Sequence, residues 1–230
     1  MRILSIDTST SETSVSISAD GAIVASISQT PHPSHSRNLL LLVKNTLEKA
    51  GLSIGEMDAF AVACGPGSFT GLRIGVSSAM GIGDALGKPV AGVGSMEAIA
   101  VSHGPAEKGF LCPILNARQG EVYAALFGFG GKGMTRVTED MALPPEELAG
   151  MLNGPVTFVG EGFAPYEQIF RGQLSEVEVF QKPARPVSEG VAACAFDLAS
   201  MGLLEKSAPS PKYVKRSQAE INWEQLHTKQ

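Results

Sequence analysis

Residues 2–18 have the sequence RILSIDTSTSETSVSIS, and this stretch opens the fold. The apolar run Arg2–Asp7 predicts a buried strand. Ser14–Ser18 alternates small polar with β-branched residues, which is the period of a half-buried strand. An Asp-Gly pair at positions 20 and 21 predicts a tight hairpin turn, so Ala22–Ser28 is expected to return as a third strand. Together these strands should form an antiparallel meander.

The chain then alternates helices with strands, as parallel crossovers require. A first helix is expected at Ser36–Ala50, and Ser68 is placed to cap a second one that ends before Gly87. After His103 the order repeats less clearly. The further expected elements are strands at Asp58–Cys64, Pro89–Val93, Phe110–Asn116, Glu121–Phe129, Val156–Gly160 and Val177–Phe180, a weak strand after Gly128–Gly133, and helices from Ser95 and at Pro144–Leu152, Pro165–Phe170 and Val187–Leu204.

This doubled order predicts an α/β fold of two lobes, residues 1–103 and a smaller unit with a tail at 104–230. The boundary is expected at His103-Gly104-Pro105. Two stacked lobes of this kind resemble the actin, sugar-kinase and heat-shock ATPase superfamily, whose lobes are duplicated RNase H-like units. The second lobe is expected to be degenerate.

The composition is that of a folded, mildly acidic protein. Of the 230 residues 43% are hydrophobic, and 18 Lys and Arg stand against 23 Asp and Glu, a net charge of −5. Because neutralising phosphates needs a basic surface, this charge argues against a protein that binds nucleic acid alone. Neither a signal peptide nor a membrane span is expected, which makes the cytoplasm the expected compartment.

The cysteines and histidines do not form a recognisable metal or disulfide pattern. Cys64, Cys112 and Cys194 are widely spaced and odd in number, which argues against a disulfide framework or a zinc knuckle. His32 and His35 lie in a proline-containing loop without a carboxylate or cysteine cluster. We therefore expect no metal site.

A polar turn at residues 7–13 joins the first two expected strands. Asp7, Thr8, Ser9 and Thr10 offer a carboxylate, hydroxyls and backbone N–H groups, the chemistry that approaches nucleotide phosphates. A hairpin turn satisfied by its own side chains is an equally good interpretation. The later loop at residues 65–73 is neither a dinucleotide fingerprint nor a Walker A motif.

The corresponding turns of the second half lack this chemistry. Asn116 lies in the turn that corresponds to the Asp7 turn, and its side chain is neutral whereas that of Asp7 is charged. Glu161 adds bulk and negative charge between Gly160 and Gly162, where ATPases of this architecture pack glycines against adenine. We therefore expect a degraded nucleotide cleft; ordinary turns between strand and helix are the alternative.

Small residues form a stripe along the second helix. Gly71, Gly75, Ala79 and Gly83 are spaced by four and so share one face. Each glycine destabilises a helix by about 1 kcal/mol relative to alanine. We expect the stripe to let a partner's helix approach closely. Packing against the protein's own sheet is the alternative, and burial of the stripe in the isolated chain would exclude docking through it.

The tail at residues 209–216 is locally basic and contains one aromatic residue, Tyr213. We expect it to be a strap that lies over the protein surface with solvated lysines. Contact with RNA inside a complex is the alternative.

Two stretches identify a family. ILSIDTS (residues 3–9) and CGPGSFTGLRIG (residues 64–75) closely resemble the bacterial TsaB (YeaZ) family, and Asn116-Ala117-Arg118, Glu121-Val122-Tyr123 and Pro211-Lys212-Tyr213 also fit. The resemblance covers essentially the whole chain. The family usually has an aspartate where this chain has Asn116.

The resemblance implies a non-catalytic scaffold, an inactive pseudoenzyme. Such proteins join TsaD and the ATPase TsaE, which place a threonylcarbamoyl group on the adenosine beside the anticodon of ANN-decoding tRNAs. TsaD holds its metal partly through a His-x-x-x-His arrangement, and Ser95 and Ile99 stand at those positions here. Contact with tRNA is expected only within the complex, and a homodimer when TsaD is absent. No cofactor of its own is expected, while ATP or ADP at an interface of the assembled complex stays open.

The family docks through its first-lobe helices, so the resemblance places the partner interface on the first two helices. The expected interface residues are Leu39, Leu42, Val43, Thr70, Gly71, Arg73, Ile74, Gly75, Ser78, Ala79, Ile82 and Gly83. The residues expected near a nucleotide are Asp7, Thr8, Ser9, Thr10 and Arg118.

Two other functions stay open. An ATP-dependent kinase or hydrolase of the same fold needs both phosphate turns, a catalytic acid and a metal. A metallopeptidase needs metal ligands that this sequence does not place together, so it ranks last.

Overall fold

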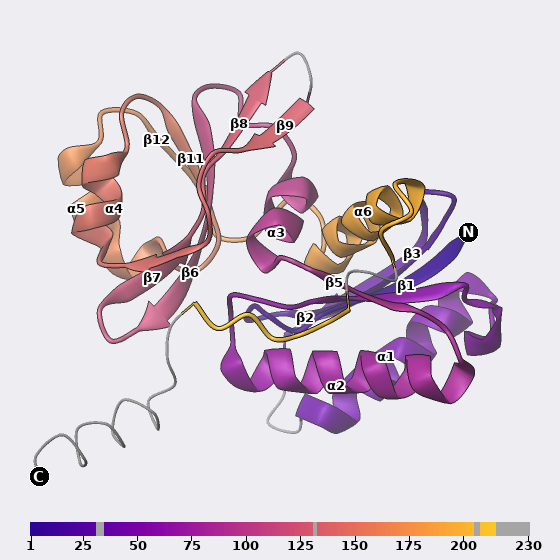
Figure 1. The fold of residues 1–230 in the computed structure, drawn as a ribbon. Helices are drawn as coiled ribbons and strands as arrows, with labels where there is room; N and C mark the ends of the chain where they lie inside the picture. The colour runs from indigo at the N-terminus through magenta and orange to yellow at the C-terminus, as the bar shows by residue number, and fades with distance from the viewer. Residues whose placement is uncertain (31–34, 131–132, 205–207, 215–230) are drawn as a thin grey trace, which may run out of the picture.

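The computed structural model describes residues 1–30, 35–130, 133–204 and 208–214, which form two lobes (Figure 1). The strands of the first lobe are β1 (Arg2–Asp7), β2 (Thr13–Ala19), β3 (Ala22–Gln29), β4 (Ala59–Ala63) and β5 (Val90–Val93). They form a sheet in the order β3-β2-β1-β4-β5. The first three strands are antiparallel, whereas β4 pairs parallel with β1 and with β5. The predicted meander with later crossovers is confirmed.

The second lobe repeats this topology. Its strands are β6 (Phe110–Arg118), β7 (Glu121–Ala124), β8 (Phe127–Gly130), β9 (Gly133–Arg136), β10 (Met141–Leu143), β11 (Val156–Val159) and β12 (Val177–Phe180). The main path runs β10-β7-β6-β11-β12, so β6 takes the place of β1 and β11 that of β4. The predicted duplicated α/β fold is therefore confirmed.

The middle of the second sheet differs from the prediction. The single strand expected at 121–129 is divided, because the chain leaves β7 at Ala125 and returns as β8 beside the start of β6. Leu126 stabilises this corner by donating its N–H to Thr138 Oγ1 at 2.9 Å. The strand expected after the glycine-rich patch is β9, which pairs with β8, while the main path ends on β10, a strand the sequence did not predict.

Helices cover both faces of the first sheet (Figure 1). α1 (His35–Ala50) and α2 (Phe69–Leu86) lie on one face, and α3 (Ser95–His103) and α6 (Val187–Ser200) on the other. α4 (Pro145–Met151) and α5 (Glu167–Gln173) pack on the second sheet. Two short 3-10 helices, η1 (Ile54–Glu56) and η2 (Ala164–Tyr166), lie in the described chain as well. Ser68 caps α2 as predicted, its Oγ accepting from the Gly71 N–H at 3.2 Å.

α6 belongs to the second half of the sequence but packs on the first lobe. It lies beyond the boundary at His103 in sequence, yet it packs against β1, β2 and α3 of the first lobe. The contact with α3 is close, because a Cβ on Gly190 would overlap the carbonyl oxygen of Ala98. α6 ends at Ser200 rather than at Leu204, since Gly202 adopts a left-handed conformation with φ of 70°.

The small-residue stripe of α2 faces the protein's own sheet. A Cβ on Gly71 would overlap the carbonyl oxygen of Thr8, and one on Gly75 would overlap Thr8 Oγ1. At Gly83 it would overlap the Val90 side chain. The interpretation of the stripe as a partner-facing surface is therefore wrong: the glycines let α2 approach Thr8, directly after β1, and Val90 of β5.

Half of the residues expected at the partner interface are likewise buried in this core. These are Leu39, Leu42, Val43, Gly75, Ala79 and Gly83. The others remain accessible to different degrees: Thr70 and Arg73 are exposed, and Gly71, Ile74, Ser78 and Ile82 are half-buried.

Within the described ranges, no helix combines the length and the apolar character needed to cross a bilayer.

Candidate functional site

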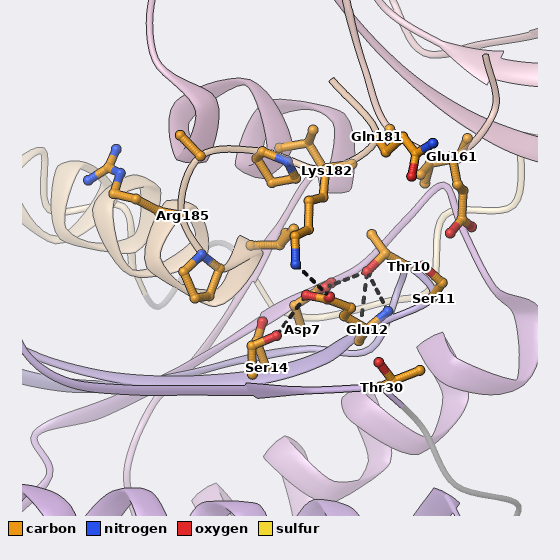
Figure 2. A pocket seen from close by; sticks show the side chains of 18 of the residues that line it. Asp7, Thr10, Ser11, Glu12, Ser14, Thr30, Glu161, Gln181, Lys182 and Arg185 are labelled. Atoms are coloured by element: carbon orange, nitrogen blue, oxygen red, sulfur yellow. Dashed lines mark hydrogen bonds and ion pairs between the residues drawn. The ribbon is translucent and has the colours of Figure 1, made fainter. Parts of the chain in front are cut away.

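A cavity of about 650 Å³ lies between the two lobes (Figure 2). The turn between β1 and β2 supplies its floor, with Asp7, Thr10 and Glu12. The opposite side comes from Glu161, after β11, from residues 181–186, which connect β12 to α6, and from Val187 at the start of α6. This volume lies within the range of small-molecule sites, so the cleft is the first candidate site.

Asp7 at the end of β1 is fully buried, and its own turn satisfies it. Its Oδ1 accepts from the Ser9 N–H at 3.0 Å and from Ser9 Oγ at 2.6 Å, and Thr10 Oγ1 lies 3.4 Å from Oδ2. The neighbouring Thr8 hydroxyl donates to the Gly71 carbonyl at 2.7 Å. The donors that a phosphate would need from Ser9 and Thr10 thus point at Asp7, which favours the self-satisfied turn over a phosphate turn.

Burial raises the pKa of Asp7 to about 6, although hydrogen bonds from Ser9 and Thr10 act in the opposite direction. The charge of Glu161 on the other side of the cleft raises the pKa further. Ionising a carboxyl group whose pKa is raised destabilises the folded protein.

Asp7 should therefore make stability depend on pH. The folded state binds the Asp7 proton more tightly than the unfolded chain, whose carboxyl has an ordinary pKa near 3.8. The folded state then holds more protons between about pH 4 and pH 6, so the contribution of Asp7 to stability falls as pH rises through this window. Relative to Asp7→Asn, the free energy of unfolding of the wild type should fall by about 2 kcal/mol between pH 4 and pH 6. Urea unfolding of both proteins across this range measures it; a difference independent of pH would contradict the burial of the charge.

The basic side chains that line the cavity are already paired. Lys182 Nζ lies 3.2 Å from Glu12 Oε1, a bridge between the lobes that is solvent-exposed and so contributes at most about 1 kcal/mol. Ser28 Oγ donates to the other oxygen of Glu12 at 2.8 Å. Arg185 turns away and donates to the carbonyls of Val101 and Ser102. Glu161 adds a negative charge to the cleft, and the basic side chains that the phosphates of a nucleoside triphosphate would need already bind Glu12 or backbone carbonyls.

The start of α3 does not offer metal ligands either. Ser95 Oγ accepts from the Gly65 N–H at 3.0 Å, and Ile99 lines the cavity as an apolar side chain. Across the part of the chain that the structure describes, no three His, Cys, Asp or Glu side chains gather as metal ligands would. His32, the side chain of His35, and His227 lie outside the described residues.

The second-lobe turns are structural. Gly160 and Gly162 pack against β6, because a Cβ on Gly160 would overlap the Ile114 carbonyl and one on Gly162 would lie 2.6 Å from the Leu115 carbonyl carbon. Arg118 is exposed at the turn between β6 and β7, where its N–H donates to Asn116 Oδ1 at 2.8 Å. Of the residues expected near a nucleotide, Asp7 and Thr10 line the cavity; Thr8, Ser9 and Arg118 do not.

A second candidate site lies on the outer surface of α1 and α2, which carries apolar side chains that the sequence-based list omits. Leu40 and Leu41 are 56% and 54% exposed, and Met80 is 41% exposed. One signal was available: the run Leu39–Val43 is wholly apolar, and one helix face can bury only part of such a run. We define the outer surface as the exposed residues Leu40, Leu41, Lys44, Thr70, Arg73, Ser77 and Met80.

The tail follows the surface as a strap up to Val214, as predicted. Lys212 donates its N–H to the Cys64 carbonyl at 2.7 Å, and the Tyr213 ring packs at a tilt against that of Phe69. Lys215 and Arg216 lie outside the described residues.

Comparison with known proteins gives the family. The family profile described as tRNA N6-adenosine threonylcarbamoyltransferase (TsaD) matches residues 22–223. The chain is 34% identical to the tRNA threonylcarbamoyladenosine biosynthesis protein TsaB of Escherichia coli over 74% of this chain and 75% of that protein. It is similar in structure to YeaZ from Pseudomonas aeruginosa, with a TM-score of 0.77, 26% identity and coverage of 92% and 99%.

A more distant structure agrees with the fold alone. A hexokinase of the ROK family from Thermus thermophilus has a TM-score of 0.52 at 13% identity, over 88% of this chain and all of that one. The two-lobed architecture is therefore the one shared with sugar kinases. The chain belongs to the TsaD-like family and, within it, to the TsaB (YeaZ) proteins of tRNA threonylcarbamoyladenosine biosynthesis.

Proposed function

We propose that the chain is a non-catalytic scaffold subunit. It binds TsaD and, with TsaE, supports the transfer of a threonylcarbamoyl group to the adenosine beside the anticodon of ANN-decoding tRNAs. The observation that carries this proposal is the cleft, where Ser9 donates its N–H and hydroxyl to Asp7 rather than to a ligand. The resemblance to TsaD further implies that Ser95 and Ile99 take the positions of its metal-binding histidines. A protein of this pathway with such a cleft acts through its surface.

The docking surface is the outer surface of α1 and α2. Leu40, Leu41 and Met80 expose apolar area there, and exposed apolar patches mark interaction sites. Arg73 lies on the same helix as Met80, and its guanidinium is 3.8 Å above the Phe69 ring. TsaD covers this surface in the complex, and a second copy of the chain covers it when TsaD is absent.

The chain contacts tRNA and a nucleotide only as part of the complex. The chain carries a net charge of −5, so its partners supply the basic surface that holds tRNA. It has no cofactor of its own, and an ATP or ADP molecule binds at an interface to which a partner contributes the phosphate donors. The compartment is the cytoplasm, where tRNA is modified.

Reconstitution tests this function. Modified tRNA should form from TsaD, TsaE and the enzyme that makes the activated carbamoyl intermediate when this chain is present, and should fall to background when it is omitted. The chain alone should not hydrolyse ATP. If the purified chain turns over ATP, and Asp7→Ala removes that activity, the chain is instead a kinase or hydrolase of the same fold.

A further inference from the structure

The strap (residues 208–214) crosses the outside of the loop that follows β4, and is drawn in yellow in Figure 1. The Lys212 N–H donates to the Cys64 carbonyl at 2.7 Å. Tyr213 holds the end of the strap on α2: its hydroxyl accepts from Arg73 Nε at 3.1 Å, and its ring lies 5.0 Å from that of Phe69. The strap therefore contacts both the loop and the first turns of α2.

The loop beneath is shaped for this contact. Gly65 has a φ of 113°, and a Cβ there would lie 2.7 Å from the Lys212 carbonyl oxygen. A side chain at this position would push the strap away. Gly65 also binds inward, donating its N–H to Ser95 Oγ and accepting from the Ser95 N–H at 2.8 Å.

The inner side of the same loop touches the floor of the cleft. The Ser68 N–H donates to the Ser9 carbonyl at 2.8 Å, and a Cβ on Gly67 would overlap that carbonyl. Ser9 in turn donates its N–H and hydroxyl to Asp7. The strap, the 65–68 loop and the Asp7 turn thus form three layers in direct contact.

The outermost layer is weakly held. Pro209 and Pro211 are half-buried, while the other residues of the strap are exposed, including Tyr213 at 46%. A segment with little apolar burial and few backbone hydrogen bonds opens well before the protein unfolds. Cys64 beneath it is 2% exposed, and the backbone of Ser210 in the strap hydrogen-bonds to its thiol, so we expect opening of the strap to uncover that thiol.

We propose that the strap is a releasable clamp, anchored by Tyr213, that presses the 65–68 loop onto the Asp7 turn and so fixes the floor of the interlobe cleft. When the strap leaves, the loop gains freedom and the Asp7 turn loses its support from outside. The clamp links the C-terminal segment of the chain to the cleft, and it is tested on the chain without TsaD.

Thiol labelling of the full-length folded chain tests the clamp. Cys64 should react about tenfold or more faster in Tyr213→Ala than in the wild type, since the anchor on Arg73 and Phe69 is lost. Lys212→Pro removes the N–H that binds Cys64 and should act in the same direction, whereas Lys212→Ala keeps that N–H and should match the wild type. Mass spectrometry reads each cysteine separately, and Cys112, buried in the second lobe, reports global opening.

One outcome would overturn the proposal at this stage, and a second would move the decision to the Lys212 variants. Cys64 labelling that stays at the wild-type rate in Tyr213→Ala means that the strap does not protect the loop. A parallel rise at Cys112 means that the variant has unfolded, and Lys212→Pro against Lys212→Ala then decides the question.

Hydrogen exchange tests the link to the cleft. The Ser68 amide, which is bonded to Ser9, should exchange faster in Tyr213→Ala, in step with Cys64 labelling. If Cys64 becomes reactive and the Ser68 amide keeps its wild-type exchange rate, the strap covers the loop without clamping it, and the proposal is wrong.

Discussion

Gly71→Ala is expected to lower the free energy of unfolding by about 3 kcal/mol, near the upper end of what overpacking usually costs. The added methyl group would overlap the backbone carbonyl of Thr8, which cannot rotate out of the way as a side chain could. α2 would have to move away from the turn that carries Asp7. Urea unfolding monitored by circular dichroism measures the change.

Gly81→Ala is the matched control on the same helix. Nothing lies within 4 Å of a Cβ built on Gly81, and alanine is the better helix former by about 1 kcal/mol. This variant should be as stable as the wild type or more so. Equal stability of Gly71→Ala and Gly81→Ala would contradict the close packing of α2 on the first lobe.

The double variant Leu41→Glu, Met80→Glu is expected to weaken binding to TsaD by about 100-fold or more while the monomer stays folded. Both side chains are about half exposed in the isolated chain, so the new carboxylates can reach solvent there. In the complex each substitution loses apolar burial worth about 1 kcal/mol, since half of each side chain is left to bury, and leaves a charge to be desolvated. Isothermal titration calorimetry with TsaD gives the affinity, and circular dichroism checks the fold.

Met151→Glu provides the comparison for that variant. Met151 is 47% exposed on α4 of the second lobe, away from the outer surface of α1 and α2, so the same change should leave TsaD affinity unaltered. Wild-type affinity of the double variant would show that TsaD docks elsewhere. Substitutions at Gly75 or Ala79 cannot decide this point, because both residues lie in the core of the first lobe.

Much of the fold was predictable because its signals are local. The alternation in Ser14–Ser18, the Asp-Gly turn and the Ser68 cap each act over a few residues, and all appear in the structure. The return of α6 to the first sheet was not predictable, since its contacts, such as Ser188 with Ser14, join residues far apart in sequence.

The residue types of the candidate site could be predicted from the sequence, whereas the groups that their side chains contact could not. Spacing by four placed Gly71, Gly75 and Gly83 on one face of a helix, but helical spacing does not say which neighbour that face meets. The turn after β1 was recognised as a carboxylate with hydroxyls, yet residue types alone do not reveal that Ser9 donates to Asp7 instead of to a ligand. Tertiary packing determines both the neighbour that the glycine stripe meets and the group to which Ser9 donates.

The yield of threonylcarbamoyladenosine in tRNA from the reconstituted reaction separates a role of the outer surface from a role of the cleft. Asp7→Asn, altered in the cleft, should support modification like the wild type, whereas the double variant Leu41→Glu, Met80→Glu should reduce it to background. Loss of modification with Asp7→Asn, together with full activity of the double variant, would contradict the account and place the function in the cleft.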